Sequence, residues 1–287
     1  MNFSILGAIN VLSPKDRGST KIAQDIAYGS AARQKLDIYA PNGSHAKLPV
    51  VKFIYGGSWS DGDRRHYDFV GRAIAALGYV TVIADYRLLP EVEYPGFLDD
   101  CSDAFAYVAD YITDYGGDPE RMALVGHSAG AYNALMLALD RRYLAERGLL
   151  DRVKAVAGLS GPYDFFPFDG KITLRTFGAV TDPKKTQPIN LVGPDAPPMW
   201  LASGDRDMLV YPRNTVALAK KLRAVGVKVT ERHFANLGHP GTLMSLGLPL
   251  RWRAPVLAEM GDFLAGHLKA SVVRTRPALN SFGQPAD

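Results

Sequence analysis

Residues 121–139 read RMALVGHSAGAYNALMLAL, and this stretch decides the fold. A short apolar run, 121–125, is followed after a glycine-rich pentapeptide by an apolar run of helical length, 129–139. The stretch has no charge after its first residue and nominally reaches transmembrane length. Its middle, however, contains histidine, serine and asparagine, which hydrocarbon penalises. We therefore expect a buried strand followed by a buried helix, and no stable membrane insertion.

The same alternation of short β-branched runs and longer helical runs extends over most of the chain. Strands are expected at 35–39, 50–55, 80–84, 153–159, 198–202 and 227–234, and helices at 68–77, 98–115, 214–225 and 255–268. Such alternation is typical of α/β proteins in which helices cover both faces of a mostly parallel sheet. The sequence predicts a single domain of this class over residues 1–270.

Three segments fall outside the alternation. Residues 161–197 mix aromatic residues, prolines and charges, and are too long for a plain connection, so we expect a small lid insertion or substrate-facing loop. Residues 1–20 are interpreted as an N-terminal arm packed on the domain. Residues 271–287 lack any period and are expected to form a mobile C-terminal tail.

Composition excludes several classes of site and partner. The 287 residues include one cysteine, Cys101, which rules out an internal disulfide framework and a cysteine-cluster metal site. With 33 basic and 29 acidic side chains the net charge is +4, and no basic block indicates a nucleic-acid partner. No nucleotide-binding glycine motif or paired-histidine helix occurs, so neither a cofactor nor a metal is expected. The sequence leaves the oligomeric state open.

The N-terminal sequence bears on the cellular compartment of the protein. The apolar stretch 2–12 has no basic residues before it and no small-residue cleavage site after it. A cytoplasmic protein is therefore expected. The alternative is a periplasmic or secreted protein whose longer leader was removed.

The pentapeptide Gly126-His127-Ser128-Ala129-Gly130 matches the Gly-x-Ser-x-Gly motif between a strand and a helix. In this context a tight turn holds the serine hydroxyl exposed at the top of a sheet. Flanking glycines have no Cβ to collide across the turn. Ser128 is therefore the candidate nucleophile, and the alternative is a serine that only caps the helix.

A serine hydroxyl needs an imidazole to accept its proton and a carboxylate to orient that imidazole. In this architecture the chain order is serine, acid, histidine, with both partners on loops after later strands. His239 satisfies the order because it lies in a glycine-flanked loop after the strand expected at 227–234. The other histidines precede Ser128, adjoin it, or lie within an expected strand or helix: His45, His66, His127, His233 and His267.

For the acid, two carboxylates follow the strand expected at 198–202. Asp207 is favoured over Asp205, because an aspartate early in a turn commonly bonds its own backbone, and Asp205 can also pair with Arg206. Asp164 is a third, more distant choice.

Acyl transfer also needs N–H donors for the developing oxyanion. The residue after the nucleophile, Ala129, supplies one backbone N–H in this architecture. The glycine turn 55–59 (YGGSW), at the end of the strand expected at 50–55, supplies the others from Gly57 and Ser58. The alternative is a glycine pair that merely allows a tight exit from the strand.

With these motifs the chain resembles the serine hydrolases of the α/β-hydrolase fold, and within them the carboxylesterase and lipase branch with a His-Gly-Gly-x-Trp oxyanion loop. Besides 55–63 and the serine pentapeptide, the segments 85–90 (DYRLLP) and 115–121 (YGGDPER) resemble motifs of that branch. The chain departs from the pattern at Tyr55, where the family usually has a histidine that supports the loop by hydrogen bonding.

The resemblance implies hydrolysis of carboxylic esters with small to medium, apolar acyl chains through an acyl-Ser128 intermediate. A small-molecule ester is then the expected partner. An amidase or formamidase using the same residues is the alternative, and a non-catalytic ligand-binding module is a further one. Aromatic residues near the expected mouth are candidates for substrate binding, although aromatic residues also build cores: Trp59, Tyr86, Tyr132 and Phe165.

Overall fold

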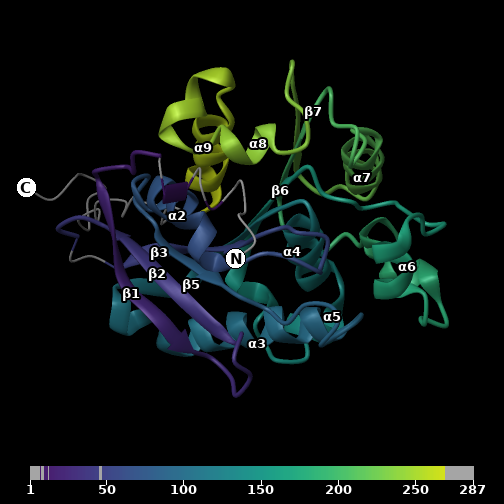
Figure 1. The fold of residues 1–287 in the computed structure, drawn as a ribbon, viewed down its shortest axis with the longest axis horizontal. Helices are drawn as coiled ribbons and strands as arrows, with labels where there is room; N and C mark the ends of the chain where they lie inside the picture. Colours follow the sequence, from purple (N-terminus) through teal and green to yellow (C-terminus); the bar gives the residue numbers. More distant parts are fainter. Residues whose placement is uncertain (1–6, 8–9, 12, 45–46, 269–287) are drawn as a thin grey trace, which may run out of the picture.

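Eight strands form one sheet in the computed structural model, which describes residues 7, 10–11, 13–44 and 47–268 (Figure 1). The order across the sheet is β1-β2-β4-β3-β5-β6-β7-β8. The first two neighbouring pairs are antiparallel and all pairs from β4 to β8 are parallel. The strands are β1 (Ser19–Ala27), β2 (Lys35–Pro41), β3 (Leu48–Ile54), β4 (Val80–Ala84), β5 (Gly117–His127), β6 (Val153–Leu159), β7 (Met199–Gly204) and β8 (Val229–Phe234).

Helices cover both faces of the sheet. The α-helices are α2 (Asp68–Ala75), α3 (Gly96–Tyr111), α4 (Ala129–Leu139), α5 (Arg141–Leu144), α6 (Lys171–Phe177), α7 (Arg213–Ala224), α8 (Gly241–Met244) and α9 (Val256–Leu268). Short 3-10 helices are η1 (Arg64–Tyr67), η2 (Ile112–Tyr115), η3 (Leu150–Arg152), η4 (Pro183–Thr186), η5 (Pro188–Leu191) and η6 (Leu248–Arg253). α2 and α9 contact each other on one side, whereas α3 and α4 pack together on the other (Figure 1).

Burial explains why the central strands read as continuous apolar runs. Every residue of β4 and β7 is buried, because helices cover both faces of a parallel sheet. α4 is buried over its whole length, since it lies between β3, β5 and β6 on one side and α3 and η5 on the other. This position accounts for its apolar sequence on every face.

The predicted α/β class and mostly parallel sheet are confirmed, and the region 121–139 forms the end of β5 and then α4. Among the described residues, no helix combines the length and apolar character that crossing a bilayer requires. One strand was not predicted: β1 begins inside the segment interpreted as an arm. It is an edge strand with two register shifts and partly exposed side chains, so its sequence lacks a clear two-residue period.

The segment 161–197 is not one irregular loop, because it contains α6, η4 and η5. Tyr163 and Phe177 are buried in the core, whereas Phe166 is exposed. In the arm, Asn10 is buried and its side chain bonds the backbone of Arg65 and Phe69. The predicted tail, 271–287, lies outside the described residues.

The parallel strands bring the chemically interesting loops to one edge. Gly57 follows β3, Ser128 follows β5, Asp207 follows β7 and His239 follows β8. Because the carboxyl ends of parallel strands share an edge, residues distant in the chain meet there.

Candidate active site

Ser128 occupies a strained turn between β5 and α4. Its backbone has φ 56° and ψ −126°, a conformation that L-residues rarely adopt. The flanking glycines allow the turn because a Cβ on Gly126 would lie 2.2 Å from the Gly130 carbonyl oxygen. A Cβ on Gly130 would lie 2.0 Å from the carbonyl oxygen of Ile54. The turn therefore requires glycine on both sides and places the hydroxyl at the end of the sheet.

Two hydrogen bonds join Ser128, His239 and Asp207. Nε2 of His239 lies 2.8 Å from Oγ of Ser128, and Nδ1 of His239 lies 2.8 Å from Oδ2 of Asp207. Because a carboxylate only accepts, Nδ1 donates to Asp207, which leaves Nε2 of the neutral ring to accept the serine proton. The structure thus brings together the three residues that the sequence predicted for the nucleophile, base and acid.

The carboxylate of Asp207 is held in place by its own loop. Its Oδ1 accepts hydrogen bonds from the N–H groups of Leu209 and Val210, at 3.0 and 2.8 Å. Burial raises the pKa of Asp207, but the hydrogen bond and charge of His239 and the two N–H groups outweigh burial and hold the pKa below its usual value. Asp207 is therefore a fixed anion beneath His239.

The alternative acids lie elsewhere. Oδ1 of Asp205 accepts a hydrogen bond from the N–H of Asn236 at 2.8 Å, so this side chain ties the loop after β8 to the loop after β7. Asp164 is exposed, and its N–H donates to Oδ1 of Asn214. The structure brings neither carboxylate to His239.

His127 lies beside the imidazole of His239, with ring centroids 5.0 Å apart. Its Nε2 is 3.0 Å from the main-chain oxygen of His239. Burial, and then the neighbouring His239, lower the pKa of His127 to about 3. His127 is therefore neutral near pH 7. In β8, His233 instead bonds Ser203 and Glu231.

The loop after β3 presents backbone N–H groups next to Ser128. Gly57 has φ 125°, and a Cβ there would lie 2.0 Å from the carbonyl oxygen of Asp61, so only glycine fits this turn. Ser58 also has positive φ, at 51°. In the described part of the chain, the N–H groups of Gly57, Ser58 and Ala129 have no hydrogen-bond acceptor. They remain available to an oxyanion at Ser128.

Tyr55, the departure from the family pattern, supports this loop. Its ring stacks between Tyr67 and Tyr86, with centroids 5.1 and 5.0 Å away. Its hydroxyl donates to Oδ1 of Asp85 at 2.7 Å and accepts from the Arg33 guanidinium at 3.0 Å. The same guanidinium donates to the carbonyl of Gly62 at 2.7 Å. Tyrosine thus connects the loop to a buried network of hydrogen bonds.

Asp85 and Arg64 form the centre of that network. Both are buried, and the backbone N–H of Arg64 donates to Oδ1 of Asp85 at 2.7 Å while their side chains form an ion pair. Nε of Arg64 also donates to Asp37 at 2.9 Å. Buried charges persist in proteins when they are paired and hydrogen-bonded in this way. The motif 85–90 therefore carries a structural carboxylate.

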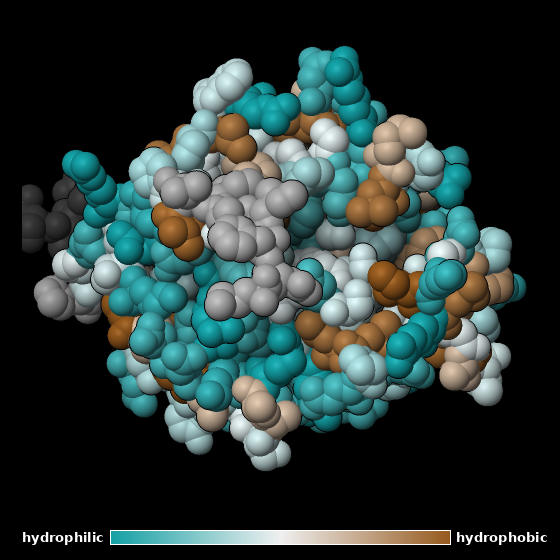
Figure 2. All heavy atoms as spheres, viewed as in Figure 1, coloured by the Kyte–Doolittle hydropathy of each residue, from teal (hydrophilic) through white to brown (hydrophobic). Residues whose placement is uncertain are grey.

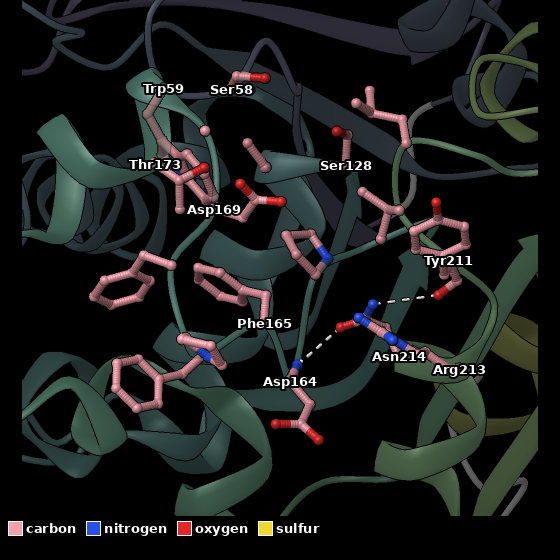
Figure 3. Close-up of a pocket in the computed structure, with 18 residues that line it drawn as sticks. Ser58, Trp59, Ser128, Asp164, Phe165, Asp169, Thr173, Tyr211, Arg213 and Asn214 are labelled. Carbon is pink, nitrogen blue, oxygen red and sulfur yellow. Dashed lines mark hydrogen bonds between the residues drawn. The ribbon is translucent and has the colours of Figure 1, made fainter.

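Two cavities open on Ser128. The larger, about 730 Å³, lies between the segment 162–173 and the loop 209–214, and contains Trp59, Phe165 and Asp169 in its wall (Figure 3). The smaller, about 380 Å³, is bounded by residues including His239 and Met244. In the described ranges, no three His, Cys, Asp or Glu side chains are grouped to bind one metal ion.

The four predicted substrate-binding residues divide into two pairs. Trp59 and Phe165 line the larger cavity. Tyr86 and Tyr132 line neither cavity, which corrects the expectation that they contact a substrate. Both are fully buried, and their hydroxyls donate to the carbonyls of Tyr55 and Thr186. Both side chains are part of the hydrophobic core.

Sequence reasoning missed most of the smaller cavity. Tyr67, from η1, and Leu243 and Met244, from α8, supply its apolar wall. The apolar pair 243–244 lies in the short helix α8, which begins two residues after His239, and both residues border the same cavity as the imidazole. Leu209, two residues after Asp207, borders both cavities and gave no signal in the sequence.

The parallel sheet covered by helices, the serine in its strained turn and the paired histidine and aspartate define an α/β-hydrolase of the carboxylesterase type. The chain belongs to the BD-FAE family, whose model matches residues 36–222.

Curated relatives agree with this class. A probable isoprenylcysteine alpha-carbonyl methylesterase of Oryza sativa subsp. japonica is 29% identical over 89% of this chain and 67% of that protein. The esterase LipQ of Mycobacterium tuberculosis is 29% identical over 84% of this chain and 61% of that protein. The chain thus spans about two thirds of the length of these two relatives.

Solved structures share the fold. A truncated carbohydrate esterase from gut microbiota superposes with a TM-score of 0.77 at 21% identity, covering 89% of this chain and 99% of that one. A thermostable esterase from Pseudomonas putida superposes with a TM-score of 0.74 at 24% identity. The match covers 93% of this chain and 89% of that one.

Proposed function

We propose that this chain hydrolyses carboxylic esters with small to medium, largely apolar acyl groups through an acyl-Ser128 intermediate. Ser128 is the nucleophile, His239 the base and then the acid, and Asp207 the carboxylate that orients His239. The observation that carries the proposal is the pair of 2.8 Å hydrogen bonds that joins a serine in a strained turn to a histidine and a buried carboxylate.

The first half-reaction forms the acyl-enzyme. Oγ of Ser128 bonds to the ester carbonyl carbon while its proton passes to Nε2 of His239. The carbonyl oxygen becomes an oxyanion, for which the N–H groups of Gly57, Ser58 and Ala129 serve as donors. The bond to the alkoxide then breaks, and the alkoxide takes the proton from Nε2 and leaves as the alcohol.

The second half-reaction releases the acid. Water bonds to the acyl carbon and gives a proton to Nε2 of His239. The acyl bond to Oγ breaks, Oγ recovers the proton, and the carboxylic acid leaves. Asp207 remains ionised throughout, because its anion fixes the tautomer of His239 and stabilises the imidazolium.

Ester hydrolysis is favoured over amide hydrolysis because the relatives are named as esterases or carboxylic ester hydrolases. An amidase would use the same three residues, so geometry alone does not separate the two. A binding module that had lost activity would lack one of the three groups, whereas this chain has all three within hydrogen-bond distance. The relatives named as methylesterases make methyl esters suitable additions to a substrate panel.

The test is initial-rate hydrolysis of p-nitrophenyl esters from acetate to laurate, with a matched anilide, by the wild-type chain and Ser128→Ala. We expect turnover of the shorter esters, slower anilide turnover, and a loss of about 1000-fold or more in the variant. Labelling with a fluorophosphonate should disappear in Ser128→Ala while circular dichroism stays unchanged. Labelling of the variant at full stoichiometry would remove Ser128 as the nucleophile.

A further inference from the structure

We infer that the two cavities at Ser128 divide the ester, the smaller taking the leaving alcohol and the larger taking the acyl group. The substrate class is then esters of uncharged, apolar alcohols whose acyl part is larger and can carry polar substituents. This inference rests on the proposed function and assigns a substrate group to each cavity.

The two cavities differ in the residues that border them. Ser58, Ser128 and Leu209 border both. His239 borders only the smaller cavity, whereas Ala129 borders only the larger. The two spaces therefore meet at the nucleophile and at part of the oxyanion loop, and they differ in their access to the imidazole.

Proton transfer decides which substituent goes where. The proton that Nε2 of His239 takes from Ser128 must pass to the oxygen of the departing alkoxide. That oxygen must come within about 2.6–3.2 Å of Nε2 for the transfer. The alcohol is therefore on the side of His239, in the smaller cavity. With the carbonyl oxygen held by the loop N–H groups, the larger cavity remains for the acyl chain.

The wall of the smaller cavity determines the kind of alcohol. Tyr67, Pro240, Leu243 and Met244 supply apolar surface. Among the described residues that line it, none is aspartate, glutamate, lysine or arginine. An alcohol with a fixed charge would lose its hydration there without a partner, which is costly. Uncharged alcohols of modest size are expected to fit.

The larger cavity combines an aromatic wall with polar groups. Figure 3 shows the Asp169 carboxylate pointing into the cavity, while that of Asp164 points away. Thr173 and Arg213 add further polar groups to its wall. Within the described ranges, Asp169 has no ion-pair partner. Polar substituents on an acyl group thus have partners here that the smaller cavity lacks.

Apolar surface continues outward from the larger cavity. Figure 2 shows brown apolar side chains gathering at the right of the molecule, where α6 lies in Figure 1. Phe166, Ile172 and Leu174 are exposed in this region. A medium-length acyl chain can therefore extend beyond the cavity along this surface, whereas the buried position of Leu243 limits the length of the alcohol on the other side.

Leu209 lies at the boundary of the two spaces. The residue is 68% exposed and borders both cavities. Its N–H donates to Oδ1 of Asp207, so the hydrogen bond that fixes the carboxylate also holds the backbone of Leu209. The boundary between acyl and alcohol is thus attached to the triad itself.

The first test uses the wild-type chain and a matrix of esters. Acyl length varies from acetyl to decanoyl with ethanol fixed, and alcohol length varies from methyl to decyl with acetate fixed. We expect kcat/KM to persist over longer acyl chains than alcohol chains. Acetylcholine should be cleaved at least about 10-fold less efficiently than its uncharged isostere 3,3-dimethylbutyl acetate, because its charge would enter the apolar cavity.

The second test uses two matched variants and separates the half-reactions. Met244→Trp narrows the smaller cavity, and Thr173→Trp narrows the larger one. Deacylation acts on an enzyme from which the alcohol has left. Met244→Trp should therefore lower acylation by long-alcohol esters about 10-fold or more relative to methyl esters, and its deacylation rate should gain no dependence on acyl length. Thr173→Trp should lower the acylation rate with long-acyl esters, and it should also change the deacylation rate of the acyl-enzymes that these esters form.

The opposite pattern would overturn the inference: a deacylation rate in Met244→Trp that falls with acyl length, or tolerance of long alcohols with exclusion of long acyl chains. If a variant fails to fold, the wild-type matrix still decides, because equal or reversed length limits contradict the division. Failure of the proposed function is distinguishable, since a folded wild-type chain would then cleave no ester in the matrix.

Discussion

The imidazole of His127 donates a hydrogen bond from Nε2 to the main-chain oxygen of His239, over 3.0 Å. The direction is fixed because a carbonyl oxygen can only accept. The residue before Ser128 thus anchors the backbone of the residue whose ring must meet the serine hydroxyl. This bond joins the end of β5 to the loop after β8, two segments that are 112 residues apart at the bonded positions, at the reaction centre.

We therefore predict that His127 is a positioning residue. His127→Ala should lower kcat by about 10- to 100-fold, because a misplacement of His239 by about 1 Å is costly for proton transfer. KM should change less than threefold, since the hydrogen bond from His127 positions His239 for the chemical step and not for substrate binding. His127→Gln, which keeps an N–H donor at a similar reach, should recover most of kcat. Equal losses in both variants would mean that the imidazole acts in another way.

The same residue makes stability depend on pH. The pKa of His127 is lowered by burial and by His239, from 6.5 to about 3. Between these values the unfolded chain binds the proton and the folded chain does not. The neutral ring therefore contributes its full share to the free energy of unfolding above about pH 6.5. This share is lost as the pH falls toward 3, by up to about 1.4 kcal/mol per pH unit.

Urea denaturation at pH 4 to 7 measures this dependence. The free energy of unfolding of His127→Gln should fall less steeply with decreasing pH than that of the wild-type chain. Parallel slopes for the two proteins would assign the acid sensitivity to other groups.

Tyr55 provides a prediction about the oxyanion loop. Tyr55→Phe keeps the stacked ring but removes the hydroxyl that bonds Asp85 and Arg33, which leaves buried polar groups short of a partner. Unfolding free energy should fall by about 1–3 kcal/mol. Because the Arg33 guanidinium also holds Gly62, kcat should fall as well, by up to about 10-fold.

Tyr143→Phe is the matched control for this substitution. The hydroxyl of Tyr143 is buried without a hydrogen-bond partner among the described residues. Its removal should leave stability unchanged or raise it. Thermal unfolding of the two variants measures the difference. Equal changes in Tm for both would contradict the role of the Tyr55 hydroxyl.

The sequence predicted most of the fold because its central strands are buried on both faces. β4 and β6 were predicted at their observed bounds, and α4 likewise, since burial on every side leaves an unbroken apolar run. β1 was missed for the opposite reason: as an edge strand with register shifts it needs few apolar residues.

For the site, the predictable part is the part that backbone geometry dictates. Gly126 and Gly130 mark the turn at Ser128, because no other residue fits there. The cavity walls were predicted less well. Tyr86 was expected in the pocket and lies in the core, since an aromatic residue has the same pattern in both places. The position of Leu209 between the cavities depends on the conformation of a loop, and no hydrophobic periodicity in the sequence predicts that conformation.

The last prediction compares the two aspartates after β7. Asp207→Asn replaces the anion that accepts from Nδ1 of His239 and favours the wrong tautomer of the ring, so kcat/KM should fall by about 10³- to 10⁴-fold. Asp205→Asn keeps an oxygen that can accept from the N–H of Asn236, and activity should stay within about threefold of wild type. Both variants should fold, which circular dichroism checks, and p-nitrophenyl acetate hydrolysis measures the difference. A larger loss in Asp205→Asn, or equal losses in both, would exclude Asp207 as the orienting acid, because only a carboxylate bonded to Nδ1 can hold the tautomer that lets Nε2 accept the proton of Ser128.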